Sequence, residues 1–454
     1  MPPTRHSLKS FLQAARNALH APPSQRPKPL TFVVGNESAD LDSLCSAVLF
    51  AYFRTHTPPH TLHIPLSHPP RADLALRPEL TAALEPAGLR PDDLLTLTDL
   101  PSWRNHSEGK QGVENSDLSL RSEDTQWLLI DHNTLAGQLA SRFADRVVGC
   151  IDHHDDEGVV PALRDLPPGN PRVIAKCGSC MSLVVDQYRS LWDDLSSLPC
   201  RDDDSVDGKP TPATTCDTQL AHLALAPMLI DTAALTSPDK TTAIDIRSVE
   251  FAEAKITPPK TSPNTTTTND TNPPTYNRTT YHALLSHQKQ AITTLTYHDL
   301  LRKDYKRWTE GRLTLGISSI VRNLTYLFTH IDTQNRTAFL DVLRRWAHEQ
   351  ELDVVAVMTA SNITEEGEGD GDGGFRRELL VWGVSEEGGM VVRRFGERFG
   401  GVLGLVRWGV GELDCDGGDK DGGLRVGWWQ REVKHSRKQV GPMLREVMRE
   451  GARL

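Results

Sequence analysis

With 454 residues, the chain has room for two or three domains, and we expect two because linkers and insertions take up part of the length. Its 60 acidic residues against 50 lysines and arginines give a formal net charge of −10, which excludes a general polyanion-binding surface. Seven scattered cysteines predict no disulfide framework, so we expect a reducing compartment and a cytoplasmic location. No run is apolar and long enough to span a bilayer, so we expect no membrane partner.

The first 20 residues predict an amphipathic helix, because five apolar side chains recur at helical spacing. They are Leu8, Phe11, Leu12, Ala15 and Leu19. We favour a helix that packs on the first domain. Since the segment has basic but no acidic residues, a mitochondrial presequence is the alternative.

In the next stretch, a predicted buried strand is followed by two acidic residues. A predicted strand ends at Val34, and a turn leads to Asp40 and Asp42 before a helix predicted over residues 43–52. Two carboxylates so close repel each other unless a cation or a proton separates them, and hard oxygen ligands suit divalent ions. For this motif alone, an ordinary acidic turn with Asp42 or Ser43 as the helix N-cap is the alternative.

Three later apolar runs are also predicted as strands, and each ends in Asp or in Asp followed by His. They end at Asp131, at Asp152-His153-His154 and at Asp231, and a helix predicted over residues 218–229 leads into the last of them. Because the carboxyl ends of parallel strands lie along one edge of a sheet, we expect the four runs to bring these side chains together. The strand before Asp131 should lie between the strands of the first and third motifs. A helix predicted over residues 133–143 would close a βαβ unit.

The fold class that follows is α/β. We expect an N-terminal domain with a doubly wound, mainly parallel sheet over residues 1–255 and a smaller α/β domain over residues 280–454. Residues 256–279, rich in Thr, Asn and Pro, are predicted to be a linker or an insertion. Exposed insertions are expected at 201–217, 364–374 and 414–423. Strands of the second domain are predicted at 313–321, 352–358 and 378–383, with an edge strand that starts near residue 427.

Together these motifs resemble the DHH phosphoesterase superfamily, named for a motif that Asp152-His153-His154 matches. GNESADLDS, LLIDHN, CIDHH and LIDT occur in the family's order. Asn36 and the loop CGSCMSLV at 177–184 resemble the fungal cytosolic exopolyphosphatases, whereas family II inorganic pyrophosphatases carry a metal-binding histidine at the position of Asn36. Segments 300–306, 316–321 and 436–440 resemble the DHH-associated second domain.

The resemblance implies a metal-dependent active site in a cleft between the two domains. Two divalent ions, Mg²⁺ or Mn²⁺, would be bound by carboxylates and one histidine and would support phosphoryl transfer to water. The implied metal ligands are Asp40, Asp42, Asp131, His153 and Asp231, with Asp131 shared by both ions. The implied catalytic residues are Asn36, Asp131, His153 and His154. The implied substrate-binding residues are His154, Ser179, Lys303, Arg322, Arg437 and Lys438. Asp152 is expected to orient a histidine.

The function implied by the resemblance is that of an exopolyphosphatase, which releases orthophosphate from the end of linear inorganic polyphosphate. An inorganic pyrophosphatase or a nucleotide phosphodiesterase of the same fold, and a non-catalytic scaffold, are the alternatives. All four motif acids are present, which weighs against the scaffold. We expect a monomer with no nucleic-acid partner.

Overall fold

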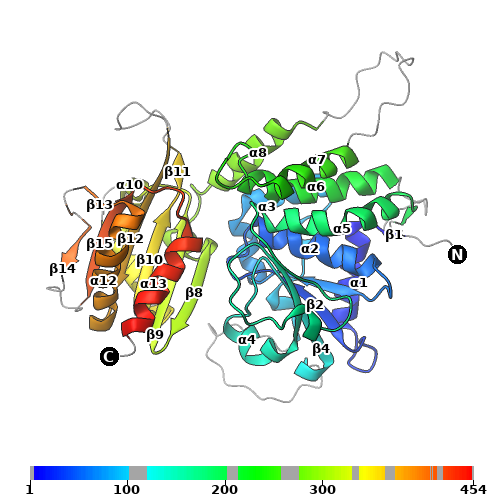
Figure 1. Cartoon of the computed structure of the whole chain (residues 1–454), viewed down its shortest axis with the longest axis horizontal. Coiled ribbons are helices and arrows are strands. Elements are labelled where there is room, and N and C mark those ends of the chain that lie inside the picture. Colours follow the sequence, from blue (N-terminus) through cyan, green and yellow to red (C-terminus); the bar gives the residue numbers. More distant parts are fainter. Residues whose placement is uncertain are drawn as a thin grey trace, which may run out of the picture. The chain divides into compact units, whose positions relative to one another are not determined.

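The computed structural model describes residues 5–101, 120–201, 213–256, 276–329, 337–362, 374–409, 411, 413–416 and 423–451. The chain forms two compact units, residues 1–288 and 289–454, coloured blue to green and yellow to red in Figure 1. The predicted insertions fall largely outside the described residues. Within the part that the structure describes, we find no helix with the length and apolarity needed to cross a membrane.

The first unit is built on a parallel sheet. Its order is β3 (His63–Leu66), β2 (Leu30–Val34), β4 (Thr125–Ile130), β5 (Val147–Asp152) and β6 (Arg172–Ile174). Every neighbouring pair is parallel. The strand before Asp131 therefore lies between those of the first and third motifs, as predicted, and the three motif ends lie along one edge of the sheet.

Helices cover both faces of this sheet, because alternate side chains of each strand point to opposite sides. Val33 belongs to one core, and its neighbours Phe32 and Val34 belong to the other. The first core is packed by α2 (Leu41–His56), α3 (Pro78–Leu84), α5 (Cys180–Ser196), α6 (Ala213–Asp231), α7 (Ala243–Ile256) and part of α8 (Arg278–Gln290). The second is packed by α4 (Gly137–Phe143) and the end of α1 (Leu8–His20). The doubly wound arrangement is confirmed.

The N-terminal helix is also confirmed, since all five of its predicted apolar side chains are buried in α1. Helices α2 and α4 differ in their bounds from the prediction. Helix α2 begins two residues early, at Leu41, because Asp40 is its N-cap. Helix α4 begins at Gly137 and not at residue 133.

The prediction of a strand before Asp231 is wrong, because this run forms the end of helix α6. The helix predicted over residues 218–229 is present, and its residues 223–229 are all buried. A short apolar run in such a helix cannot be told from a buried strand by its periodicity. Pro227 lies inside it, where proline removes one backbone hydrogen bond. Residues 213–217, predicted as part of an exposed insertion, form the first turn of this helix.

A disulfide contradicts the expectation that the cysteines stay unpaired. Cys200 and Cys216 are bonded and join β7 (Cys200–Arg201) to α6. Strand β7 pairs in parallel with β1 (Arg5–His6). The two cysteines are 16 residues apart in no recognisable motif, so their spacing gave no signal.

The second unit contains a mixed sheet. Its main order is β13 (Leu405–Arg407), β15 (Leu424–Gln430), β12 (Phe375–Gly383), β10 (Val354–Thr359), β9 (Leu313–Ile320) and β8 (Tyr305–Glu310), with β11 (Ser361–Asn362) on β12 and β14 (Cys415–Asp416) on β15. Only β9 and β10 pair in parallel among these described strands. The run near residue 427 lies in β15, which is not an edge strand as predicted, because β13 pairs with it.

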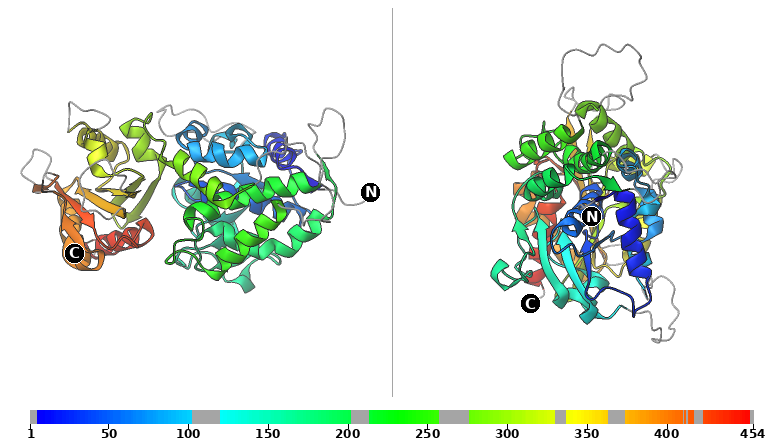
Figure 2. Two further views of the ribbon diagram at one scale, coloured as in Figure 1. Left: turned by 90° about the horizontal axis from the view of Figure 1, so that it is seen from above. Right: turned by 90° about the vertical axis from the view of Figure 1, so that its right-hand side faces the viewer.

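Two cores flank this sheet as well. Val355 and Val357 of β10 face α9 (Tyr297–Lys303), α10 (Leu324–Thr329) and α11 (Ala338–Glu349). Val354 and Ala356 face α12 (Glu386–Leu403) and α13 (Arg437–Gly451). Figure 2 shows α11, in yellow, and α13, in red, on opposite sides of the strands. The smaller α/β domain predicted for the C-terminal half is confirmed.

Candidate metal centre

The loop between β2 and α2 is shaped by Asn36. Its Oδ1 accepts hydrogen bonds from the Ser38 backbone N–H at 3.0 Å, the Ser38 hydroxyl at 2.6 Å and the Ala39 N–H at 3.2 Å. Its Nδ2 donates to the carboxylate Oδ2 of Asp131 at 2.7 Å. Because three donors occupy its oxygen, Asn36 positions Asp131 rather than offering an oxygen ligand of its own.

Asp131 lies at the carboxyl end of β4 and is only 2% exposed. Its Oδ2 accepts from Asn36 and from the Ser43 hydroxyl, the latter at 2.6 Å. Its Oδ1 lies 3.1 Å from Nε2 of His153 and 3.6 Å from Nδ1 of His154. The backbone has a φ of 62°, in the left-handed region that few non-glycine residues adopt. One oxygen is thus held by the first motif, and the other faces the two histidines.

His153 is oriented by a backbone carbonyl. Its Nδ1 is 3.1 Å from the Cys177 oxygen, which can only accept, so the ring proton lies on Nδ1. Nε2 faces Asp131 and Oδ2 of Asp42, at 3.1 and 3.9 Å, where it can hold a second proton or, without it, bind a metal ion. The neutral ring with its proton on Nδ1 is the tautomer that a metal ligand needs.

His154 is oriented by a carboxylate and not by a backbone carbonyl. Its Nδ1 lies 2.7 Å from Oδ1 of Asp152, whose other oxygen accepts from Asn133 at 2.6 Å. Burial alone would raise the pKa of Asp152, but the hydrogen bonds and charge of His154 with the Asn133 contact lower it to about 2. The prediction that Asp152 orients a histidine is confirmed, and the histidine is His154.

Asp42 is held by the N-terminus of helix α5. It accepts from the backbone N–H groups of Cys180 at 2.6 Å and Met181 at 3.0 Å, and from the hydroxyls of Ser179 at 2.8 Å and Ser46 at 3.1 Å. The positive end of a helix dipole favours a carboxylate at this place. Ser179 was expected to bind substrate, but it is buried and its hydroxyl is committed to Asp42.

The acids of the site affect one another strongly. Burial raises the pKa of Asp42 well above its ordinary value, and the charges of Asp131, Asp231 and Asp40 raise it further, against the opposite effect of His153. Asp40 and Asp231 are both half-buried and come from the start of α2 and the end of α6. The charges of the other four predicted metal ligands thus all act on Asp42.

The donor set fits a divalent cation. Ligand atoms of Asp131, His153 and His154 all lie within 4.8 Å of one another, although the prediction placed His154 on the substrate and not among the metal ligands. Carboxylate oxygens suit Mg²⁺ and Mn²⁺, and an imidazole nitrogen adds affinity for the transition metals. A cation would also relieve the repulsion that raises the pKa of Asp42.

Sequence reasoning missed Asp245, a buried residue of α7 that forms the layer behind Asp42. Its carboxylate accepts from the N–H groups of Gly178 at 2.9 Å, Ser179 at 3.3 Å and Thr242 at 2.8 Å. Four successive N–H groups at residues 178–181 are therefore divided between two carboxylates. Gly178 has to be glycine, because a Cβ there would lie 2.7 Å from the Lys240 carbonyl. No motif in the sequence marks Asp245.

The predicted cations lie in the second unit, three of them around α9 and α13. Lys303 ends α9 and is buried, and Lys438 is exposed. Arg437 binds the Asp304 carboxylate at 2.7 Å and its carbonyl at 2.9 Å. Arg322 donates to the carbonyl of Gln290 at 3.2 Å.

Two lysines act on Asp304 together with Arg437. Burial alone would raise the pKa of Asp304, but Arg437, Lys306 and Lys289 hold it below its ordinary value. Sequence reasoning did not single out Lys306 as a phosphate contact, and it missed Lys289. The structure thus gives the second unit a cluster of positive charge around one aspartate.

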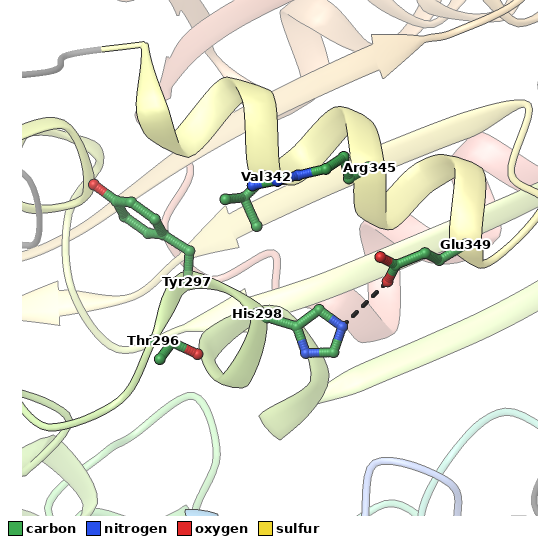
Figure 3. Close-up of a pocket in the computed structure, with 6 residues that line it drawn as sticks. All are labelled: Thr296, Tyr297, His298, Val342, Arg345 and Glu349. Atoms are coloured by element: carbon green, nitrogen blue, oxygen red, sulfur yellow. Dashed lines mark hydrogen bonds and ion pairs between the residues drawn. The ribbon is translucent and has the colours of Figure 1, made fainter. Parts of the chain in front are cut away.

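A separate pocket of about 320 Å³ lies between α9 and α11 (Figure 3). It is lined by Thr296, Tyr297, His298, Val342, Arg345 and Glu349. His298 Nε2 and Glu349 Oε2 face each other at 3.2 Å. None of these residues was predicted to belong to the site.

Comparison with known proteins finds a family match for each of the two units. Residues 31–199 match the DHH family, N-terminal domain, and residues 283–447 match the DHHA2 domain. A Schizosaccharomyces pombe protein named "Putative exopolyphosphatase" is 28% identical over 448 residues, which cover 99% of this chain and 97% of that protein. Exopolyphosphatase PRUNE1 of Mus musculus is 25% identical over 354 residues, 78% of this chain and 63% of the mouse protein.

A solved structure shows the same fold. The crystal structure titled as a Methanococcus jannaschii "putative family II inorganic pyrophosphatase" superposes with a TM-score of 0.51, at 18% identity, over 92% of this chain and 99% of that one.

Proposed function

Because the chain belongs to the DHH family and carries its DHHA2 domain, we propose that it is a metal-dependent exopolyphosphatase. Its substrate would be linear inorganic polyphosphate, and its product orthophosphate released from the chain end. The near full-length similarity to a protein named as an exopolyphosphatase supports the proposal. We further propose that it acts as a monomer in the cytoplasm.

The observation that carries the proposal is the geometry of Asn36. At the position of the pyrophosphatase ligand histidine, this chain has an amide that donates to Asp131 and whose oxygen accepts three hydrogen bonds. By this resemblance the cluster has one metal-ligand nitrogen fewer than a family II pyrophosphatase. This difference favours the exopolyphosphatase over the pyrophosphatase.

We assign Asp40, Asp42, Asp131, His153 and Asp231 as ligands of two divalent ions, Mg²⁺ or Mn²⁺. Such ions supply Lewis acidity for the phosphoryl oxygens and lower the pKa of water. Asn36 and Ser43 hold Asp131, and the Cys177 carbonyl fixes the tautomer of His153.

His154 is proposed to contact the substrate. Its Nδ1 donates to the Asp152 carboxylate, which favours the doubly protonated imidazolium, and the side chain is 21% exposed. In that form Nε2–H can also donate to an oxygen of the terminal phosphate. In the second domain, Arg437, Lys438, Lys303 and Arg322 are proposed to bind further phosphates. We assign residues 1–255 to the metal-binding domain, 256–279 to the linker or insertion and 280–454 to the substrate-binding domain.

The test measures orthophosphate released from long polyphosphate, tripolyphosphate and pyrophosphate, and nucleoside monophosphate formed from a cyclic nucleotide. We expect release from both polyphosphates with Mg²⁺ or Mn²⁺, none with EDTA, and little from the other two. Faster hydrolysis of pyrophosphate would show a pyrophosphatase, and hydrolysis of the cyclic nucleotide alone a phosphodiesterase. No hydrolysis of any of the four substrates, with metal bound, would support a scaffold.

A further inference from the structure

The turn that leads to Asp40 has an unfavourable backbone conformation. Ala39, directly before Asp40, has a φ of 45°, which is costly for a residue with a Cβ. Its N–H and that of Ser38 are bound to the side-chain oxygen of Asn36. The N–H groups of the turn thus face Asn36, and the Ser38 and Ala39 carbonyls need donors from another element.

Arg77 provides those donors. Its Nε donates to the Ala39 carbonyl at 2.7 Å and its Nη2 to the Ser38 carbonyl at 2.7 Å, while Nη1 donates to the Asp73 carbonyl at 2.9 Å. The side chain is only 4% exposed and comes from the N-cap of α3, far along the chain. A planar guanidinium can bind three carbonyls at fixed angles, which a lysine cannot do.

We infer that Arg77 is a positioning residue of the metal centre. By binding both carbonyls of the strained turn, it fixes left-handed Ala39 and so the direction of Asp40, whose Oδ1 caps α2 through the Ser43 N–H at 3.0 Å. Arg77 acts through the turn and does not itself touch metal or substrate. The inference rests on the proposed function only in the role given to Asp40.

The test compares Arg77→Lys with a matched control, Arg71→Lys. Arg71 lies in the 3-10 turn just before Arg77 and also binds a backbone carbonyl, that of Leu94 at 2.8 Å, but it contacts the Asp99 carboxylate and not the Asp40 turn. Mg²⁺ affinity is measured by titration calorimetry without substrate. We expect R77K to bind Mg²⁺ about ten- to a hundredfold more weakly, as for other residues that hold a ligand, and R71K to bind as wild type.

A double-mutant cycle with Asp40→Asn separates positioning from general destabilisation. If Arg77 acts through Asp40, R77K causes no further loss of Mg²⁺ affinity in the D40N background. Equal losses in both backgrounds, or wild-type affinity in R77K, would overturn the inference. Melting in EDTA is recorded first, and Arg77→Gln replaces R77K in the cycle if the lysine variant is unfolded. Since no substrate is used, the result stands even if polyphosphate is not hydrolysed.

Discussion

At Asp131, one carboxylate oxygen is held by Asn36 and Ser43 while the other faces His153. An asparagine could keep all these contacts, because its oxygen accepts from Asn36 and Ser43 and its amide can donate to Nε2 of His153. It could not serve as a charged ligand shared by two cations.

We therefore expect Asp131→Asn to remove turnover without unfolding the protein. Removing one of several repelling charges should leave the melting temperature in EDTA equal to or above that of wild type. Activity and melting are measured on the same preparation. Retention of even roughly a tenth of the activity at saturating Mg²⁺ would show that Asp131 is not the shared ligand.

The raised pKa of Asp42 makes a pH-dependent prediction. The folded state holds this proton more tightly than the unfolded state, so metal-free protein loses stability as the pH rises from the ordinary Asp range through the raised pKa. Asp231→Asn removes one of the charges that raise it and so reduces the loss. In EDTA we expect D231N to melt higher than wild type at about pH 8 and the difference to shrink at about pH 5. A difference that is independent of pH would show that Asp231 does not act on Asp42.

At the scale of elements, the loop before α5 is fixed by two buried carboxylates, Asp42 on one side and Asp245 on the other. Asp245→Asn would place an amide among N–H donors and break this arrangement. We expect a loss of about 1–3 kcal/mol in stability and about tenfold in activity.

The control for this variant is Asp186→Asn. Asp186 also joins α5 to α7, through a partly exposed ion pair with Arg247 at 2.6 Å, but it does not contact the loop. We expect near-wild-type activity from D186N. If both variants lose activity alike, the effect comes from helix packing and not from the loop.

The elements of the fold differ in how far the sequence could predict them. Helix α1 and strand β4 were predictable, because one shows clear helical spacing and the other is a short apolar run that ends in a charged residue. Helix α6 was predictable only in part, because residues 223–229 form an apolar, wholly buried run that carries no periodic signal. The motif acids could be singled out, because each follows an apolar run and matches a motif of the family that the sequence resembles. Ser43, Arg77 and Asp245 could not, because their roles depend on contacts between distant segments.

At the scale of the whole molecule, the proposed metal ligands all lie in the first unit, and Arg437 and Lys438 lie in the second. If these cations bind phosphate, neutralising either one should lower kcat/KM by about ten- to a hundredfold, since each charge-assisted hydrogen bond contributes roughly 1.5–3 kcal/mol. Mg²⁺ affinity should not change. For Arg437→Ala the loss of the Asp304 ion pair is a second effect, and Asp304→Asn is its control.

Comparing substrates of different length shows where along polyphosphate these two cations bind. A loss on both tripolyphosphate and long polyphosphate would indicate binding near the cleaved bond, and a loss on long polyphosphate alone would indicate binding further along the chain. Wild-type kinetics of both variants on both substrates would contradict a role of these cations in substrate binding.

The central claim is most directly tested by the products formed from long polyphosphate with Mg²⁺, resolved by gel electrophoresis together with an orthophosphate assay, for wild type and D131N. We predict that wild type releases orthophosphate from the first time point without a burst of mid-length fragments, and that D131N releases none. Mid-length fragments as the first products, or equal release by D131N, would contradict an exopolyphosphatase centred on Asp131.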